Sequence, residues 1–583
     1  MCGLFGHIGS TEYDLDRSRG ALQTLAHRGP DQWGEWFNQK VYIGHRRLSI
    51  LDLSEQGRQP MADPDGNVTI AVNGEIYNYL ELKNELSRKY RFKSQSDSEV
   101  LLYGYQEWGI GGILEKIDGM YAFCIFDRLR QKLFLARDRA GIKPLYYAVI
   151  GKTIAWASEL KAIEAFFSDR PLEIDRTALY DFLTYLYVPT PKTLYRNVYK
   201  LEPAHYIEID ADSNRVQKHR YWSLTVSERP IPLEAAGEEL RRLVKKSVRE
   251  QMMSDVPVGF FLSGGIDSSA VTAEASALSS RIRTYSIGFD HERHDETAFA
   301  ERVALHFHAE HEKRILDRTS AKALFDRLKE WYDEPFGDTS AFPTYLVSKF
   351  AKEKSTVALT GDGGDELFGG YNWYARFKRN KERRRRYSRH LRWIPSMMKN
   401  GSMRPLRRLS EKIALHFLDD LELYTELMGG MLKDEKKEYA LLWEIPGDYD
   451  DYWHFRRYYR EELPLLTRLQ YLDFHTYLPD DILTKVDRVS MAVALEARVP
   501  LLSRELIEFS FSLQEETRYL GGQLKGLMKR AYTGVLPDEI IRREKKGFSI
   551  PLKSWAGDSW TGDLRTQEYI IDRWFHQTMD RKS

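Results

Sequence analysis

Residues 258–269, VGFFLSGGIDSS, constrain the fold of this chain more than any other stretch. An apolar run typical of a buried strand ends at two glycines, and a segment of helical character follows. Two glycines let backbone N–H groups converge beside a helix start, where the positive dipole end also attracts an anion. The pattern predicts a strand, a phosphate-binding turn and a helix, with an ordinary capped turn as the alternative. The glycine and polar residues of this turn are Ser263, Gly264, Gly265, Asp267, Ser268 and Ser269.

Acidic residues in two loops predict a cation beside the phosphate. Asp267 would repel a phosphate unless a cation lay between them, which indicates Mg²⁺ and a nucleotide. A second loop, GDGGDELFGGY at 361–371, follows the apolar run STVALTG and brings Asp362 and Asp365. Because ligands of a parallel sheet bind at the carboxyl ends of its strands, we expect both loops to face one site. The alternative is a pair of solvated acidic turns, which is disfavoured because each loop follows a predicted strand.

Two regions of different pattern predict a multidomain α/β and α+β protein. Before about residue 160 the chain is rich in strands, which predicts a layered antiparallel-sheet domain. From about residue 236 strands alternate with helices, which predicts a doubly wound parallel sheet with additional helices. The predicted domains are 2–215 and 236–583, with a boundary near 210–235 and an unplaced basic segment at 372–450.

Charge and composition exclude several functional classes. Lys plus Arg total 87 and Asp plus Glu total 86, so no overall field attracts nucleic acid or an anionic membrane. No apolar run approaches the ~18 residues of a membrane span, and no basic region followed by an apolar one opens the sequence. We therefore expect a cytoplasmic protein without nucleic-acid or membrane partners. Cys124 lies in the apolar run YAFCIF and is predicted to be a buried small hydrophobe.

Two local patterns leave weaker alternatives. The basic run KERRRRYSRHLRW at 381–393 has helical spacing and little aromatic interleaving, which favours a solvated helix face over a nucleic-acid site. The pairs His291/His294 and His308/His311 have metal-like spacing, but they lack a third ligand nearby, which disfavours zinc.

Cys2 is a candidate nucleophile. If Met1 is removed, as the small second side chain permits, residue 2 presents a thiol and a free α-amine on one carbon. An α-amine with an unperturbed pKa of ~7.7 to 8.0 is an effective general base near neutrality. The alternative is an accidental cysteine near a frayed terminus.

Polar groups in the strand-rich region match the needs of an amino-acid substrate. Arg47 offers a guanidinium for an α-carboxylate, and Asp97 offers a carboxylate for an α-ammonium. The Asn73 side chain and the Gly74 N–H are donors for a tetrahedral oxyanion formed on an amide. Taken singly, each residue is more typical of a surface ion pair or a turn.

Six segments in order resemble a class II glutamine amidotransferase domain. They are MCGLFGHIG at the start, HRGPD at 27–31, RLSILDL at 47–53, NGEIYN at 73–78, SDSE at 96–99 and RDRAGIKPLYY at 137–147. The resemblance implies a fold like that of the N-terminal-nucleophile (Ntn) hydrolases, with Cys2 as the glutaminase nucleophile. It also implies that Asn73 and Gly74 form the oxyanion hole. The residues it assigns to glutamine are Arg47, Ile50, Leu51, Asn73, Gly74, Glu75 and Asp97.

The later segments resemble the synthetase domain of glutamine-hydrolysing asparagine synthetase, of the ATP pyrophosphatase class. They are SGGIDSS at 263–269, YSIGF at 285–289, DEPFGDTSAFPTY at 333–345, GDGGDELFGGY, DRVSMAVALEARVPLL at 487–502 and REKKGFSIP at 543–551. By this resemblance Leu262, Ile287, Thr360 and Gly361 contact ATP, and 263–269 cradle pyrophosphate. Asp267 and Asp365 would bind Mg²⁺. Lys545 would steady negative charge as a catalytic residue, and Asp362, at the position where the family carries Glu, is also an expected catalytic residue.

The resemblance implies asparagine synthesis from aspartate with glutamine-derived ammonia. The acceptor carboxylate attacks ATP, pyrophosphate leaves, and an acyl adenylate forms. Because ammonia must arrive unprotonated, a sheltered passage between the domains is required. The alternative keeps this chemistry and changes the acceptor to another carboxylate, such as a sugar acid for surface polysaccharide. The expected partners are glutamine, ATP and aspartate or another carboxylate, and a homodimer is left open.

Overall fold

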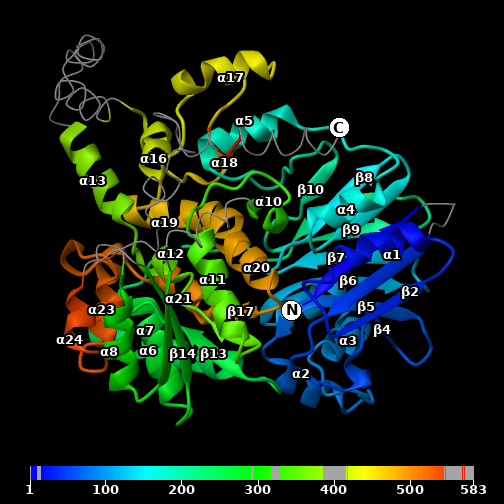
Figure 1. Ribbon diagram of the computed structural model, residues 1–583, viewed down its shortest axis with the longest axis horizontal. Helices are drawn as coiled ribbons and strands as arrows, with labels where there is room; N and C mark the ends of the chain where they lie inside the picture. Colours follow the sequence, from blue (N-terminus) through cyan, green and yellow to red (C-terminus); the bar gives the residue numbers. More distant parts are fainter. Residues whose placement is uncertain are drawn as a thin grey trace.

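The computed structural model describes residues 2–9, 15–289, 295–316, 327–384 and 418–543, together with Leu415, Lys545, Glu568, Ile570 and Ile571. Two antiparallel sheets build the N-terminal half, and one parallel sheet with many helices builds the other. The two halves lie side by side, with the blue and cyan strands beside the green to red helices (Figure 1). The predicted fold class is confirmed.

The first antiparallel sheet has the order β10-β8-β9-β1-β3-β2. Its strands are β1 (Gly3–Ile8), β2 (Gln32–Phe37), β3 (Val41–Arg47), β8 (Tyr146–Ile150), β9 (Thr153–Ala157) and β10 (Val198–Lys200). The second sheet has the order β12-β11-β7-β6-β5-β4. Its strands are β4 (Met61–Ala62), β5 (Val68–Ile76), β6 (Gly119–Asp127), β7 (Lys132–Arg137), β11 (His205–Asp210) and β12 (Val216–Arg220).

The two antiparallel sheets pack face to face and are covered by helices on their outer faces. Apolar side chains from both sheets, including Ile43, Trp156 and Leu135, form one buried cluster between them. Cys124 lies fully buried in this cluster, as predicted, and burial raises the pKa of its thiol to about 12. Helices α1 (Leu15–Gln23) and α4 (Leu160–Phe166) cover the first sheet, and α2 (Tyr79–Leu86) and α3 (Glu99–Lys116) cover the second.

The parallel sheet has the order β15-β14-β13-β16-β17. Its strands are β13 (Val258–Phe261), β14 (Arg283–Phe289), β15 (Glu310–Leu316), β16 (Val357–Leu359) and β17 (Glu496–Arg498). All four neighbouring pairs are parallel, as expected for strands that alternate with helices.

Helices cover both faces of the parallel sheet. Helix α6 (Leu233–Gln251) buries Leu240, Val244 and Val248, which recur at the spacing of one helix face. Together with α7 (Ile266–Ser276) and α8 (Thr297–His306) it packs on one face, and α11 (Ala341–Lys352) packs on the other. The remaining helices are α5 (Arg176–Tyr185), α10 (Leu328–Trp331), α12 (Gly364–Phe368), α13 (Asn372–Arg384), α16 (Asp420–Met428), α17 (Lys437–Leu442), α18 (Trp453–Tyr458), α19 (Leu465–His475), α20 (Leu483–Met491), α21 (Arg504–Ser512), α22 (Glu515–Arg518), α23 (Gly526–Ala531) and α24 (Asp538–Arg542).

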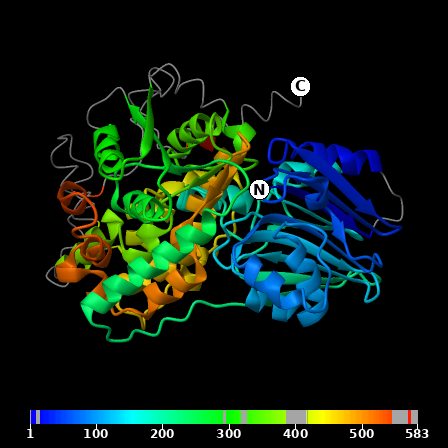
Figure 2. The ribbon, with the colours of Figure 1, turned by 90° about the horizontal axis from the view of Figure 1, so that it is seen from below.

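The connection between the halves is an extended segment from β12 to α6. It runs along the edge of the molecule in Figure 2. Helix α5 precedes it in the chain and nevertheless lies against the C-terminal half, where the Tyr185 hydroxyl donates to the Asp451 carbonyl at 3.0 Å. The division into domains at 2–215 and 236–583 stays a prediction.

Some residues that were singled out in the sequence fall outside the described part of the chain. Of the basic run at 381–393, only 381–384 are described, at the end of α13. Lys381 there donates to Asp420 at 2.5 Å and Arg384 donates to the Leu418 carbonyl at 2.8 Å, so both make intramolecular contacts. Of the histidine pairs with metal-like spacing, His291 and His294 lie outside the described part.

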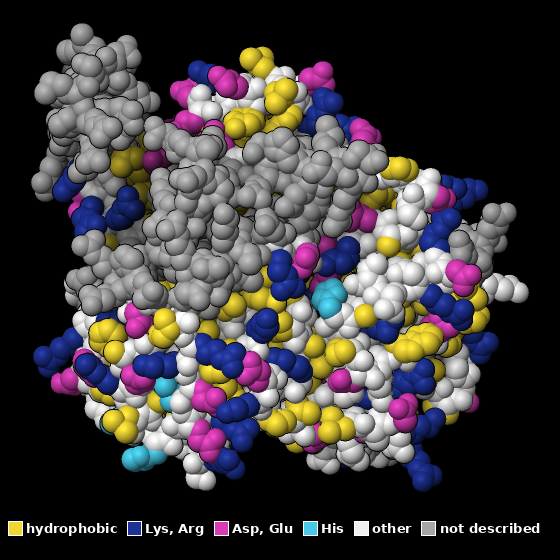
Figure 3. All heavy atoms as spheres, viewed as in Figure 1, with side chains coloured by type: hydrophobic (Ala, Val, Ile, Leu, Met, Phe, Trp, Pro, Cys, Tyr) yellow, Lys and Arg dark blue, Asp and Glu magenta, His cyan; other side chains and the backbone are white. Residues whose placement is uncertain are grey.

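The described surface mixes both signs of charge. In the view of Figure 3, Lys and Arg side chains alternate with Asp and Glu side chains over the coloured part of the surface. Among the described residues, no helix has the length and apolar character needed to cross a membrane.

Candidate active site

The phosphate-turn motif folds as a strand, a tight turn and a helix. Gly264 has φ +71°, and a Cβ built on it would lie 2.6 Å from the Phe299 Cβ and 2.7 Å from the Ala300 nitrogen. Only glycine fits this backbone. Gly265 is the N-cap of α7, and its N–H donates to the Ser263 hydroxyl at 3.2 Å. The turn therefore presents backbone donors at the amino end of α7.

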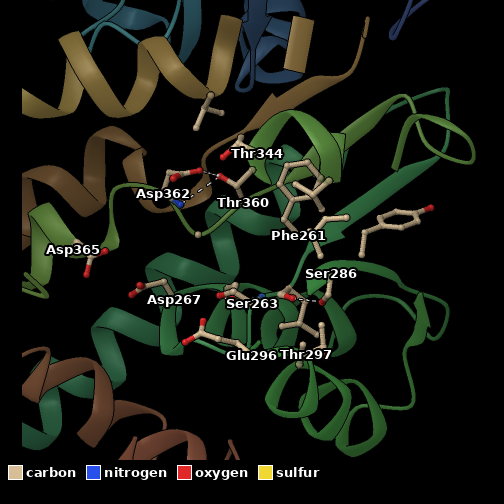
Figure 4. Close-up of a pocket in the computed structure, with 18 of the residues that line it drawn as sticks. Phe261, Ser263, Asp267, Ser286, Glu296, Thr297, Thr344, Thr360, Asp362 and Asp365 are labelled. Atoms are coloured by element: carbon tan, nitrogen blue, oxygen red, sulfur yellow. Dashed lines mark hydrogen bonds between the residues drawn. The ribbon is translucent and has the colours of Figure 1, made fainter. Parts of the chain in front are cut away.

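A cavity of about 210 Å³ opens beside this turn. Strands β13 and β14, the loop after β16 and helix α11 contribute its walls (Figure 4). It includes ten of the residues assigned to ATP, metal or synthetase chemistry: Leu262, Ser263, Asp267, Ser268, Ile287, Thr360, Gly361, Asp362, Asp365 and Lys545. Gly264, Gly265 and Ser269 do not line it, and Ser269 is fully buried inside α7. Their individual roles stay predictions.

Two aspartates and two lysines form the acidic end of the cavity. Figure 4 shows Asp267 and Asp365 on the same side of the cavity, away from Ser286 and Thr297. Lys525 forms salt bridges with Asp267 and, at 2.6 Å, with Asp365, and Lys545 also bonds to Asp365. Burial raises the pKa of Asp267, whereas Lys525 and Lys545 outweigh burial at Asp365 and lower its pKa.

Sequence reasoning missed Lys525. It precedes α23 with φ +54°, a left-handed conformation uncommon for lysine, and its side chain is 4% exposed. No local motif distinguishes it from the other lysines of the C-terminal region. Only the fold brings it between two acidic residues that lie more than 150 positions away in the chain.

Asp362 lies at the opposite side of the same loop from Asp365. Its carboxylate accepts a hydrogen bond from the Thr360 hydroxyl at 2.7 Å, drawn as a dashed line in Figure 4. Lys485 of α20 lies nearby and donates to Asp338 at 3.0 Å and to the Ser340 hydroxyl at 2.8 Å. Burial opposes its charge, but Asp338 and Asp362 raise its pKa above the usual range, so Lys485 is a buried ammonium.

The acidic pair suits a divalent cation that a polyphosphate carries. Asp267 Oδ1 is buried and has no hydrogen-bond partner among the described residues. Mg²⁺ commonly takes one or two protein carboxylates, while phosphate oxygens and water complete its shell. In the described part of the chain no three His, Cys, Asp or Glu side chains gather around one metal position. A site of protein ligands alone is therefore not formed by those residues.

The second candidate site surrounds Cys2. The Cys2 N–H donates to Asn73 Oδ1 at 2.9 Å, which ties the residue to β5. Asn73 Nδ2 is buried and has no hydrogen-bond partner in the described part of the chain. Gly74 has φ +145°, and a Cβ there would lie 1.9 Å from the Met120 carbonyl oxygen. The arrangement leaves one buried amide donor beside a cysteine, as an oxyanion hole requires.

The residues assigned to glutamine gather around this cysteine, with most of their polar atoms engaged by the protein. Asp97 accepts the Ile76 N–H at 2.6 Å, and burial raises its pKa. Arg47 donates to Gln32 at 2.7 Å, to the Leu51 and Ser54 carbonyls at 3.0 and 3.2 Å, and to the Asp52 carbonyl. The Ile50 carbonyl accepts the Asp255 N–H at 3.0 Å. Their contacts with glutamine stay predictions.

Arg28 connects Cys2 to the other half of the molecule. Its Nε donates to the Cys2 carbonyl at 3.0 Å, and its Nη1 donates to Glu159 and to Asp487 of α20, each at 2.8 Å. Lys143 lies 3.4 Å from the same Asp487. All four charged side chains are at most 2% exposed. The motif HRGPD marks this region in the sequence, but it does not identify the distant partner.

Two family models and several known proteins match the chain. The family model described as asparagine synthase matches residues 239–578, and the glutamine amidotransferase domain model matches residues 1–222. Asparagine synthetase 1 (glutamine-hydrolysing) of Bacillus subtilis is 32% identical, over 99% of this chain and 92% of that protein.

Two further relatives align over nearly the whole chain. Asparagine synthetase 3 of Bacillus subtilis is 30% identical, over 100% of this chain and 92% of that protein. Amidase chry2 of Gibberella zeae is 28% identical, over 96% of this chain and 90% of that protein. The chain belongs to the glutamine-hydrolysing asparagine synthetase family.

Proposed function

We propose that this enzyme makes asparagine from aspartate, glutamine and ATP through an acyl adenylate. The family is that of glutamine-dependent ligases with ATP as a substrate. The observation that carries the proposal is the presence of two complementary sites in one chain. A cysteine lies beside an unpartnered buried amide donor, and a phosphate turn lies beside paired aspartates and lysines.

Cys2 releases ammonia from glutamine in the first half-reaction. Burial raises the pKa of the Cys2 thiol, so it needs a base, and the α-amine freed by removal of Met1 supplies one. The thiol attacks the side-chain amide, and Asn73 Nδ2 with the Gly74 N–H stabilises the oxyanion. Ammonia leaves with the proton that the amine took, and water hydrolyses the remaining thioester.

The acceptor carboxylate is activated in the second half-reaction. A carboxylate oxygen attacks the α-phosphorus of ATP, and the bond to pyrophosphate breaks. The turn at 263–268 binds the departing group through N–H and hydroxyl donors, and Lys525 and Lys545 offset its charge. Mg²⁺, held by Asp267 and Asp365, would supply further charge neutralisation on the phosphates. Ammonia then attacks the acyl carbon and AMP leaves, with Asp362 placed to accept a proton.

Ammonia crosses between the two sites in this scheme. One hydrophobic cluster contains side chains from both halves. Its members include Leu48, Ile50, Met120, Ala140 and Ile142 from the N-terminal half, and Leu483, Met491, Val499 and Leu501 from the other. An apolar contact of this kind excludes water, which would otherwise protonate ammonia. We propose that the passage runs through this cluster.

Aspartate is the first choice of acceptor because the family relationship covers both halves. The alternative is another carboxylate, such as a sugar acid. The two differ in the α-ammonium group that only aspartate carries. Asp338 and Asp362 both lie beside the ammonium of Lys485, whereas burial and Asp338 raise the pKa of Asp481 well above its usual value, so Asp481 is not counted as a charge. An excess of negative charge there favours an acceptor with a cationic group.

An acceptor panel tests this proposal. Purified enzyme with ATP, Mg²⁺ and ammonium is given aspartate, glutamate or a uronic acid, and AMP release is measured. We expect AMP only, or at least ten times faster, with aspartate. Release of AMP with the uronic acid and none with aspartate would assign the same chemistry to another product.

A further inference from the structure

A buried arginine of the C-terminal half, which contains the parallel sheet, faces the predicted glutamine pocket. Arg498 ends β17, the edge strand of the parallel sheet, and is 1% exposed. Its Nη2 lies 3.5 Å from Glu75 Oε1, and Glu75 follows the oxyanion-hole residues on β5. A cation paired with this glutamine-binding candidate therefore comes from the other half of the molecule.

The remaining nitrogens of Arg498 are fully engaged. Nε donates to Glu496 at 2.6 Å, and Nη1 donates to the Gln251 and Met253 carbonyls at 2.7 Å each. Nη2, in contrast, makes no hydrogen bond among the described residues. These contacts fix the plane of the guanidinium and direct a free N–H pair toward Glu75.

Like charges crowd Glu75, and Arg498 opposes them. Burial and the neighbouring Asp97 and Glu496 raise the pKa of Glu75 well above its usual value, whereas Arg498 acts to lower it. Tyr77 faces the same charges, and burial keeps its hydroxyl neutral by raising its pKa. Among the described residues, Arg498 is therefore a buried cation that favours the ionised form of Glu75.

We propose that Arg498 is a positioning residue of the glutaminase site, which orients Glu75 as a carboxylate for the α-ammonium group of glutamine. This inference rests on the proposed glutaminase function and assigns part of that site to the C-terminal half. Glu496 acts on the same group with the opposite sign, because its negative charge competes for Arg498.

Arg498 also belongs to the framework of the ATP site. Its carbonyl accepts the Thr360 N–H at 2.9 Å, at the point where β16 leads into the cavity loop. One residue therefore contacts the nucleotide loop through its backbone and the glutamine pocket through its side chain.

The test measures glutamine binding as a function of pH. The Cys2→Ala protein serves as the background, because without the thiol glutamine is not hydrolysed during the measurement. L-Glutamine is titrated into it by calorimetry between pH 5 and 8. Binding of the α-ammonium requires ionised Glu75, so affinity falls as the pH drops through the pKa of Glu75. Arg498→Gln removes a favourable charge and should move this midpoint up by about one pH unit. Glutamine affinity at the original midpoint should fall several-fold.

Glu496→Gln should move the midpoint in the opposite direction, to lower pH, because it removes a repelling carboxylate. Opposite shifts are not produced by a general loss of structure. Arg498→Lys should restore part of the shift, and Arg242→Gln, an exposed change on α6, should leave it unmoved. Far-UV circular dichroism and the Tm of each variant report that the fold is intact.

Shifts of opposite sign would support the proposal. Equal midpoints, or shifts in one direction, would overturn it while leaving the glutaminase assignment in place. If Arg498→Gln does not fold, Glu496→Gln alone tests the proposal. An unmoved midpoint of glutamine binding in Glu496→Gln would show that the neighbouring charges do not act on Glu75. If the Cys2→Ala protein makes AMP but never binds glutamine, the proposed glutaminase site itself is wrong.

Discussion

The balance of positive and negative charge around single residues differs between the two sites. At the nucleotide site two aspartates meet two lysines, and the lysines lower the pKa of Asp365 despite its burial. At the glutaminase site carboxylates outnumber cations around Glu75, and its pKa rises. The sequence predicted Asp267, Asp365 and Lys545 from local motifs. It did not predict Lys525, because no residue near it in the chain shares its contacts.

Cys2→Ala should abolish glutamine hydrolysis, since no other thiol lies at this site: Cys124 is buried between the sheets. Asparagine formation from added ammonium should persist, because the nucleotide site has its own groups. Glutamate release and asparagine formation are measured on the same preparation. Surviving glutaminase activity, or intact mass showing that Met1 is retained in active enzyme, would contradict the N-terminal nucleophile.

Asp267→Asn should suppress acceptor-dependent AMP release by about 10²-fold or more. It removes a proposed metal ligand and one of the two carboxylates that pair with the Lys525 ammonium. Basal glutamine hydrolysis should stay within a few fold. The Mg²⁺ concentration that gives half-maximal AMP release should rise as well. Undiminished AMP formation in this variant would mean that the loop binds something else.

Individual elements followed from the sequence where the pattern is local. The hairpin of β6 and β7 and the unit of β13 and α7 lie where apolar runs are interrupted by turn residues in the sequence. Strand β17 has only three residues, and its pairing with β16 is a contact across more than 130 positions. Such a short segment has no period to read, so its place beside the glutamine pocket follows only from the fold.

Strand β5 should not tolerate a side chain at Gly74. Gly74→Ala would place a Cβ at 1.9 Å from the Met120 carbonyl and requires φ +145°, so β5 must shift and carry Asn73 with it. Glutaminase turnover should fall about 10²-fold, since small misplacements near the reacting atoms are costly. Gly20→Ala on α1 is the control, because no atom lies within 4 Å of the added Cβ and its backbone is helical. Equal glutaminase rates in both variants would contradict the steric argument.

At the scale of the whole molecule, buried ion pairs join the halves. Arg28 and Lys143 of the N-terminal half share Asp487 of α20, and Arg488 lies 3.5 Å from Glu159. The motifs HRGPD and DRVSMAVALEARVPLL contain three of these residues, Arg28, Asp487 and Arg488. Their pairing was beyond sequence reasoning, because nothing in either motif specifies a partner more than 400 positions away.

Asp487→Asn should destabilise the protein by about 3 to 5 kcal/mol near pH 7, because it leaves buried cations uncompensated. Burial acts against the charge of Asp487, but Arg28 and Lys143 hold its pKa below the usual value. Its stabilisation is therefore complete above about pH 4 and is lost as the pH falls through the lower folded-state pKa. The difference in Tm between variant and parent should shrink in that acidic range. Asp212→Asn, in an exposed pair with Lys40, should change Tm little.

The central claim is that both halves act on one acceptor, and a double isotope label tests it most directly. The enzyme is given glutamine labelled with ¹⁵N in its amide and aspartate labelled with ¹⁸O in its side-chain carboxylate. Mass spectrometry of the products should find ¹⁵N in the asparagine amide and one ¹⁸O in AMP for each asparagine made. Asparagine without ¹⁸O in AMP would contradict the acyl adenylate, and labelled ammonium without labelled asparagine would contradict the transfer between the two sites.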